Sequence, residues 1–184
     1  MSEMLKEELP YTKIKVDENL TLRQLNLDEA EHLFELVDQD RVHLGKWLPW
    51  VKETLSPKDS EDFIKSKIDE RKAGEEYGYG IVYDNEVVGH MSLMHLNDHK
   101  DPEIGYWISS KMAGKGITTL ATGALTNFGF NTLGLKKIII KADPENSGSN
   151  RVAEKLGYKL LNKQVDEDRI STSNIWVLEK PEDR

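Results

Sequence analysis

The most constraining feature of the sequence is a glycine-containing turn that leads directly into a long amphipathic helix. The turn, residues 111–119, has glycines at positions 114 and 116. Glycine lets backbone N–H groups approach a ligand closely, and a helix N-terminus carries a partial positive charge, so this pattern predicts a phosphate or pyrophosphate site. A glycine turn that only starts a helix is the alternative. The helix is indicated by apolar residues at the spacing of one helical face, namely Ile117, Leu120, Ala121, Ala124, Leu125 and Phe128.

Two familiar phosphate-binding patterns do not fit this turn. A dinucleotide-binding fold would need a third glycine where Thr119 stands, and a P-loop would need Gly-Lys-Ser/Thr after a four-residue spacer. The turn therefore predicts phosphate binding without indicating a nucleotide fold.

The rest of the chain alternates between strand and helix patterns. Asp84-Asn85 tolerates the positive φ angles of a tight turn and separates two β-rich runs, which predicts a hairpin. We expect residues 43–50 to form a loop. Helices are expected at residues 27–37, 59–73, 117–128 and 147–156. Strands are expected at residues 13–25, 79–83, 86–96, 102–108, 136–141, 159–166 and 170–179.

Composition narrows the class of protein. The chain has 184 residues, no cysteine and a net charge of −8, which predicts one globular domain over residues 1–184 with a flexible or extended segment at 1–12. Without cysteine there is no thiol nucleophile and no thiolate metal site. No apolar run approaches the roughly 20 residues of a membrane span. The first residues lack the apolar region of a secretory signal, and basic residues are scattered, so we expect a cytoplasmic protein that does not bind nucleic acid.

The turn and the segments around it resemble a known family. Lys111-x-x-Gly114-x-Gly116 is similar to the Arg/Gln-x-x-Gly-x-Gly/Ala pyrophosphate loop of the GNAT superfamily of N-acetyltransferases, with lysine in place of the usual arginine or glutamine. Asn146-x-x-Ser149 and residues 152–158 resemble the next helix of that family. Within the superfamily the chain resembles the RimJ/RimL branch, which acetylates N-terminal amines of ribosomal proteins and related acceptors, in Trp47-Leu48-Pro49-Trp50, Glu103-Ile104-Gly105-Tyr106-Trp107 and Phe128-Gly129-Phe130. The resemblance covers residues 14–180.

The resemblance implies an α/β (α+β) fold of one domain, in which helices flank a mixed central sheet that splays after its fourth strand, residues 103–108. It implies acetyl-CoA as cosubstrate and no metal. The diphosphate would bind the amides of residues 114–118, the pantetheine arm would pair with the backbone of residues 104–108, and Asn146 would bond to that arm. The residues expected to bind acetyl-CoA are Ile104, Tyr106, Trp107, Ile108, Lys111, Met112, Gly114, Lys115, Gly116, Ile117, Thr118, Thr119, Asn146 and Ser149.

Two residues are candidates for catalysis. Many family members place a tyrosine acid seven residues after the asparagine, but Ala153 stands there in this chain. Ser149 lies on the inward face of its helix, and we expect it to protonate the departing thiolate; a buried serine that bonds to helix carbonyls or caps the first turn is the alternative. Glu103 is the candidate base, directly or through water, with an exposed carboxylate at a strand end as the alternative.

The acceptor side is less diagnostic. Trp47, Trp50 and Glu103 are expected to line it, although both tryptophans could instead pack between a helix and the sheet. His90 and His95 are five residues apart on an expected strand and would face opposite sides, so we predict no metal site.

We expect direct acetyl transfer to a primary amine, with the N-terminal α-amine of a ribosomal-type protein as acceptor. The alternatives are an acetyltransferase of a small amine or antibiotic, and a non-catalytic CoA-binding regulatory module. The last strands offer an edge for a homodimer.

Overall fold

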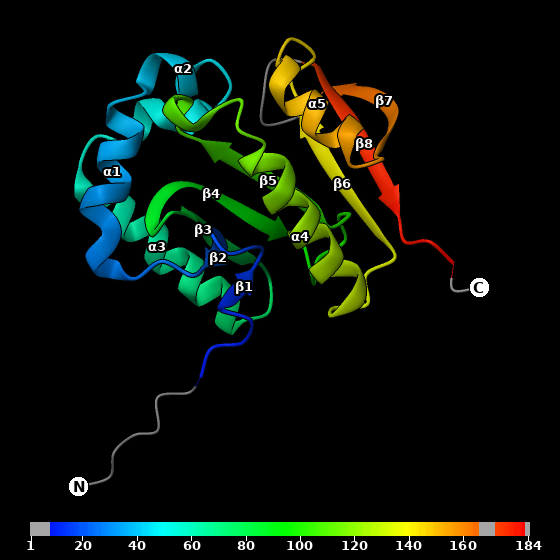
Figure 1. Ribbon diagram of the computed structural model, residues 1–184, viewed down its shortest axis with the longest axis horizontal. Helices are drawn as coiled ribbons and strands as arrows, with labels where there is room; N and C mark the ends of the chain where they lie inside the picture. The colour runs from blue at the N-terminus through cyan, green and yellow to red at the C-terminus, as the bar shows by residue number, and fades with distance from the viewer. Residues whose placement is uncertain (1–7, 166–171, 183–184) are drawn as a thin grey trace, which may run out of the picture.

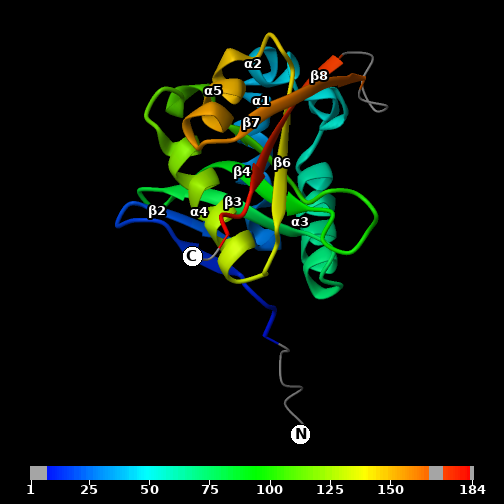
Figure 2. The same ribbon diagram turned by 90° about the vertical axis from the view of Figure 1, so that its right-hand side faces the viewer.

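A mixed sheet of eight strands forms the centre of the computed structural model, which describes residues 8–165 and 172–182. The order is β1-β2-β3-β4-β5-β6-β8-β7, and only β5 and β6 pair in parallel (Figure 1). Figure 2 shows β6, β8 and β7 from their own side of the molecule. The strands are β1 (Lys13–Lys15), β2 (Leu20–Arg23), β3 (Tyr77–Tyr83), β4 (Glu86–Met94), β5 (Glu103–Ile108), β6 (Lys137–Ala142), β7 (Lys159–Val165) and β8 (Thr172–Glu179).

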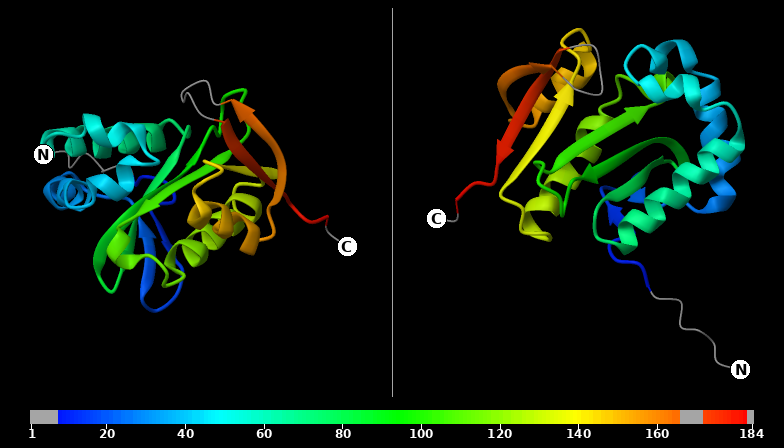
Figure 3. Two further views of the ribbon diagram at one scale, coloured as in Figure 1. Left: turned by 90° about the horizontal axis from the view of Figure 1, so that it is seen from above. Right: turned by 180° about the vertical axis from the view of Figure 1, so that it is seen from behind.

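Helices cover both faces of this sheet. In the view from above, α1 to α3 lie on one side of the strands, and α4 and α5 lie on the other (Figure 3). The α-helices are α1 (Ala30–Asp38), α2 (Arg41–Gly45), α3 (Pro57–Lys72), α4 (Ile117–Asn131) and α5 (Ser147–Lys155). The 3₁₀ helices are η1 (Leu27–Glu29), η2 (Pro49–Glu53) and η3 (Ser110–Met112).

Strand alternation divides the core between the two helical layers. Met91 and Leu93 of β4 are buried in the cluster that contains the inward residues of α4. His90, the residue before Met91, faces the other way. Its ring packs against the Phe63 ring of α3, with 4.9 Å between the ring centroids. Burial lowers the pKa of His90 to about 3, so this histidine is a neutral core residue.

The sheet opens between β5 and β6, as the resemblance predicted. The two strands share one register pair, Glu103 with Ile139, and both lie wholly within the described residues. Beyond that pair β6 diverges from β5, which leaves the rest of β5 bonded only to β4 among the strands described. Since residues 13–25 form two strands and not one, the strand after which the sheet splays is the fifth in chain order.

The prediction of a loop at residues 43–50 is wrong. The segment contains the end of α2 and the start of η2. The Arg41 guanidinium donates to the Val51 carbonyl at 2.8 Å and also to the Thr54 carbonyl, so the two short helices are held together by bonds that span 10 and 13 residues.

The end of the expected N-terminal segment is bound to the sheet. Tyr11 packs edge-on against Tyr77 and Phe128, with ring centroids 5.6 and 5.2 Å apart. The fully buried Arg71 donates to the Tyr11 carbonyl at 2.8 Å and to the Gln24 side chain at 2.6 Å. The remainder of the segment, residues 1–7, lies outside the described residues, as do the predicted strand positions 166, 170 and 171.

Strand β7 is an edge of the sheet and carries two exposed leucines, Leu160 and Leu161. The homodimer expected at this edge stays a prediction. Over the part of the chain that the structure describes, no helix is long and apolar enough to cross a bilayer.

Candidate active site

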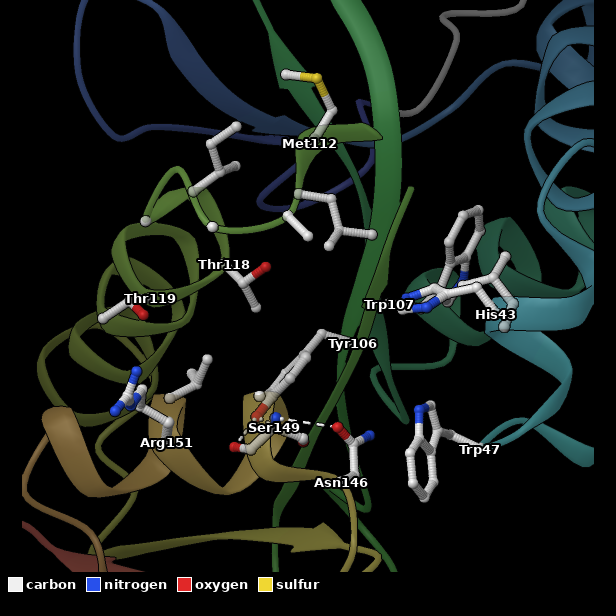
Figure 4. A pocket seen from close by; sticks show the side chains of 18 of the residues that line it. His43, Trp47, Tyr106, Trp107, Met112, Thr118, Thr119, Asn146, Ser149 and Arg151 are labelled. Atoms are coloured by element: carbon white, nitrogen blue, oxygen red, sulfur yellow. Dashed lines mark hydrogen bonds between the residues drawn. The ribbon is translucent and has the colours of Figure 1, made fainter. Parts of the chain in front are cut away.

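A cavity of about 430 Å³ lies where β5 and β6 separate, within the size range of small-molecule sites. Figure 4 shows its two sides, with His43 and Trp47 facing Thr118, Ser149 and Arg151 across Tyr106. The lining residues are His43, Leu44, Trp47, Leu48, Tyr106, Trp107, Ile108, Met112, Ala113, Gly114, Gly116, Ile117, Thr118, Thr119, Asn146, Gly148, Ser149, Arg151, Val152 and Lys155.

The glycine turn forms one side of this cavity. Gly114 and Gly116 have φ angles of +78° and +76°, a region that side-chain-bearing residues rarely adopt, and Gly116 is the N-cap of α4. The first N–H groups of α4 therefore point toward the cavity without helical partners. Of the residues predicted here, Lys111 and Lys115 are exposed and do not line the cavity. Those that line it are Met112, Gly114, Gly116, Ile117, Thr118 and Thr119.

The backbone of β5 faces the same cavity. The Ser109 N–H donates to Val88 of β4 at 2.9 Å, while the Pro102 carbonyl accepts from Ile139 of β6 at 2.8 Å. Because the direction of backbone groups alternates along a strand, the N–H groups of residues 104, 106 and 108 point to the β6 side. The first of these lies where β5 still pairs with β6, so only the N–H groups of residues 106 and 108 face the gap. The predicted cofactor residue Ile104 does not line the cavity, because its side chain is buried in the core and its backbone lies where β5 and β6 still pair. Its three predicted companions Tyr106, Trp107 and Ile108 line the cavity.

Ser149, Tyr106 and Asn146 meet at the floor of the cavity (Figure 4). Ser149 Oγ donates to the Tyr106 hydroxyl at 3.0 Å, and that hydroxyl donates to the Ser149 carbonyl at 3.0 Å. Asn146 Oδ1 accepts from the Ser149 N–H at 3.2 Å and so caps α5. Burial raises the pKa of Tyr106 to about 12, with a smaller opposing effect from the Ser149 hydrogen bond, so the phenol stays protonated at neutral pH.

Sequence reasoning treated Tyr106 as a backbone contact and missed its bond to Ser149. The two residues are 43 positions apart, and no local pattern connects them. The Ser149 hydroxyl donates to Tyr106, and the side chain that caps α5 is that of Asn146.

Glu103 and Trp50 are not brought to the cavity. Glu103 lies at the end of β5 where the sheet is still closed, pairs with Ile139, and has its carboxylate 3.7 Å from Lys141 Nζ. The strand was predicted correctly, but the cavity opens at its other end, so the position of Glu103 gives no support to a role as base or acceptor ligand. Trp50 packs against Trp107 with ring centroids 5.9 Å apart. Of the two tryptophans, Trp47 alone lines the cavity.

The α2 side of the cavity was largely missed. His43 lies in α2, and Trp47 follows two residues after the end of this helix, where its N–H donates to the Leu44 carbonyl at 3.2 Å. Asp40, at the N-terminus of α2, accepts from the Ser110 N–H at 2.9 Å and from the Ser110 hydroxyl at 2.6 Å, which ties this side to the glycine turn.

Arg151 and Lys155 of α5 were also missed. They are four residues apart and bring positive charge to the cavity near the glycine turn. Together with the backbone N–H groups, they match a ligand that carries several phosphates at one end. The open strand edge of β5 matches the extended amide-bearing arm of the same ligand, so the residues present fit acetyl-CoA.

The described histidines do not form a metal-binding cluster. His90 is buried under α3, and His95 lies 2.7 Å from Asp98 at the surface. Within the described residues no three metal-binding side chains come together.

Comparison with known proteins agrees with this site. The model of the acetyltransferase (GNAT) domain family matches residues 19–159. The chain is 34% identical to the Bacillus subtilis (strain 168) protein named "Putative ribosomal N-acetyltransferase YdaF", over 78% of this chain and 80% of that one. It is 27% identical to the ribosomal-protein-serine acetyltransferase of Escherichia coli (strain K12), over 80% and 83%.

A solved structure has the same architecture. The microcin C7 self-immunity acetyltransferase MccE, in complex with acetyl-CoA and AMP, superposes with a TM-score of 0.83, at 27% identity, over 94% of this chain and 98% of that one. The chain therefore belongs to the acetyltransferase (GNAT) domain family and is an N-acetyltransferase that uses acetyl-CoA.

Proposed function

We propose that this protein transfers the acetyl group of acetyl-CoA to the N-terminal α-amine of a protein, with a ribosomal protein as the acceptor. The observation that carries the proposal is the hydrogen-bonded pair of Ser149 and Tyr106, which lies between the glycine-turn side of the cavity and the α2 side. The names of the Bacillus and Escherichia relatives support the choice of acceptor. A cytoplasmic location follows from that choice.

Different residues of the cavity would bind different parts of acetyl-CoA. The α4 N-terminus, with Gly114 and Gly116, would hold the diphosphate, and Arg151 would add charge from α5. The N–H groups of residues 106 and 108 can bond an extended arm or polarise a carbonyl. When bound, acetyl-CoA supplies the acetyl thioester. Asn146 has its side-chain oxygen engaged with α5, so its amide N–H₂ is the part directed to a ligand.

Ser149 and Tyr106 handle the proton of the leaving sulfur. In the transfer a C–N bond forms and the C–S bond breaks. The sulfur gains a proton and the amine nitrogen loses one, which can return to Ser149 Oγ through water. Ser149 Oγ can give that proton by turning its hydroxyl from Tyr106 to the cavity. The Tyr106 hydroxyl lies 3.0 Å from both Oγ and the carbonyl oxygen of Ser149, so it can then donate to the serine oxygen and stabilise the charge that develops there.

An α-amine makes the smallest demand on such a site. With a pKa of 7.7–8.0 it is about 10% neutral at pH 7, whereas a lysine amine near 10.4 is roughly 0.04% neutral. The acceptor enters in our proposal along His43 and Trp47, whose side chains face Tyr106 (Figure 4). The role of Glu103 as a base forms no part of the proposal.

The test is a CoA-release assay with matched peptides. One peptide begins with a free serine or alanine amine and carries an internal lysine; its partner is the same sequence with the N-terminus already acetylated. We expect release with the first and none with the second. Release with both peptides would mean lysine acetylation and would overturn the proposal.

A small-amine acceptor is the second candidate. The spermidine N(1)-acetyltransferase of Escherichia coli (strain K12) is 32% identical, but over only 42% of this chain. Spermidine included in the same assay would decide between the two classes. Faster release with spermidine than with every free-amine peptide would favour the small-amine activity.

A further inference from the structure

Asn150, the residue after Ser149, has all of its side-chain hydrogen-bonding capacity in use although it does not line the cavity. Its amide nitrogen donates to the carbonyls of Asp143 and Asn146, each at 2.8 Å. Its amide oxygen accepts from Asn174 Nδ2 at 3.0 Å and from Trp176 Nε1 at 2.8 Å. An amide side chain can donate two hydrogen bonds and accept two, so Asn150 is fully satisfied by these four partners.

The two carbonyls belong to the turn that carries the cavity residues. This turn, residues 143–146, joins the end of β6 to the start of α5. Asn146 lines the cavity and holds the Ser149 N–H at 3.2 Å. The Asp143 carbonyl also accepts from the Asn146 N–H at 2.9 Å. Asn150 therefore fixes both ends of the turn from behind.

The two donors come from a paired strand of the sheet. Asn174 and Trp176 lie on β8, opposite Ala142 and Ile140 of β6, so they stand level with the end of the strand that enters the turn. Asn174 is buried, and Trp176 packs against the main core. Asn150 thus joins the turn to the sheet independently of the backbone connection through β6.

We propose that Asn150 is a positioning residue, which holds Asn146 and Ser149 at the cavity through a network anchored on β8. The proposal rests on the proposed function for its effect on catalysis, but its effect on CoA binding does not depend on any acceptor. Loss of the network lets the turn move, and displacement of a site group by about 1 Å can reduce a rate on the order of 100-fold.

The first test is Asn150→Asp, which keeps the shape but places carboxylate oxygens against two carbonyls. We expect the Kd for CoA, measured by calorimetry on folded protein, to rise about tenfold, with a parallel fall in kcat. Trp176→Phe removes one donor to Asn150 and should raise the Kd about threefold. If Asn150→Asp does not fold, the Kd of the Trp176→Phe variant decides the test.

The matched control is Tyr158→Phe. It removes a buried hydrogen bond of 2.7 Å to Thr126 of α4, and Tyr158 itself lies three residues beyond the end of α5. It should lower the thermal midpoint as Trp176→Phe does, yet leave the Kd within about twofold. Thermal midpoints of all variants separate lost stability from lost position.

A double-mutant cycle on the Kd for CoA distinguishes a positioning role from a purely structural one. In an Asn146→Ala background, Asn150→Asp should add less than about threefold to the Kd, because the residue through which it acts is absent. Multiplicative effects, or a wild-type Kd in both Asn150→Asp and Trp176→Phe, would overturn the proposal. Dependence of CoA affinity on Asn150 without acetyl transfer to any peptide would overturn the proposed function and leave the positioning role standing.

Discussion

The two walls of the cavity are built by different means. The first wall, made of the glycine turn, the start of α4 and β5, presents mainly backbone groups, namely N–H groups at a helix N-terminus and along an open strand edge. The second wall, made by α2 and the residues after it, presents the side chains of His43, Leu44, Trp47 and Leu48. Backbone groups are retained whenever the fold is retained, whereas side chains can change without altering it. We therefore expect the first wall to bind the common acetyl donor and the second to select the acceptor.

The largest effect is expected where the two walls meet. Ser149→Ala removes the proton donor and should lower kcat by about 100-fold or more, since general acid–base roles are typically worth 10²–10⁴. CoA affinity should stay within about threefold, because the Asn146 bond goes to the Ser149 backbone. The control is Ser147→Ala, at an exposed position of α5 that does not line the cavity. A Ser149→Ala enzyme with kcat within threefold of wild type would remove the acid role.

The first wall can be broken at its backbone. Gly116→Val places a β-branched residue at a φ of +76°, which costs on the order of 1–3 kcal/mol or forces the turn to change shape. The Kd for CoA should rise about tenfold or more. Gly134→Val carries the same kind of strain at a φ of +71°, in a turn that does not line the cavity. If both variants lose stability but neither loses CoA affinity, the turn does not bind the diphosphate.

Tyr106 lies between the two walls, and its ionisation should change the free energy of unfolding at high pH. Its pKa is raised by burial to about 12, above the ordinary tyrosine value near 10, so between pH 10 and 12 the unfolded chain loses a proton that the folded chain keeps. The free energy of unfolding should therefore be unaffected by this group below pH 10, and should fall by up to about 1.4 kcal/mol per pH unit above it.

Tyr106→Phe should remove that part of the alkaline decline. Tyr158, whose pKa burial also raises to about 12, lies outside the cavity and provides the comparison. Chemical denaturation from pH 8 to 11 measures the free energy of unfolding of wild type, Tyr106→Phe and Tyr158→Phe. Only Tyr106→Phe should also reduce kcat. An equal alkaline decline in wild type and Tyr106→Phe would mean that the phenol is not buried as described.

The second wall should respond through the acceptor alone. Trp47→Ala removes a large side chain from the α2 side and should raise the KM for the acceptor peptide about fivefold, close to 1 kcal/mol of binding, with the Kd for CoA unchanged. Trp50→Ala is the matched control, because Trp50 packs on Trp107 and does not line the cavity. Equal effects of the two substitutions on the acceptor KM would mean that Trp47 does not contact the acceptor.

The same contrast explains what could be predicted from the sequence. The first wall is encoded locally, since two glycines and a helical stripe within 20 residues are enough to indicate a turn at a helix N-terminus. The second wall depends on distant bonds. Helix α2 has five residues, too few for a periodic pattern, and Arg41 holds it to carbonyls 10 and 13 positions away. Glu103 is predicted at the site because its strand is recognisable from the sequence, but which end of that strand opens depends on the course of β6, which begins only at Lys137.

The smallest effect is expected at the contact between Asp40 and Ser110, which joins the α2 wall to the segment that leads into the turn. The Asp40 carboxylate accepts from the Ser110 N–H and hydroxyl at 2.9 and 2.6 Å, and both residues are exposed or nearly so. Asp40→Asn keeps one acceptor oxygen and removes the charge, which should cost less than about 1 kcal/mol and raise the acceptor KM about twofold.

The control is Asp38→Asn, which breaks the exposed ion pair with Arg41 at 2.7 Å without touching Ser110. If the walls act independently, Asp40→Asn will change the acceptor KM and leave the Kd for CoA as it is. If bound CoA instead tightens acceptor binding through Asp40 and Ser110, the substitution will change the Kd for the acceptor peptide less when CoA is absent. A peptide titration with and without CoA therefore measures whether the backbone wall and the side-chain wall are coupled through this bond.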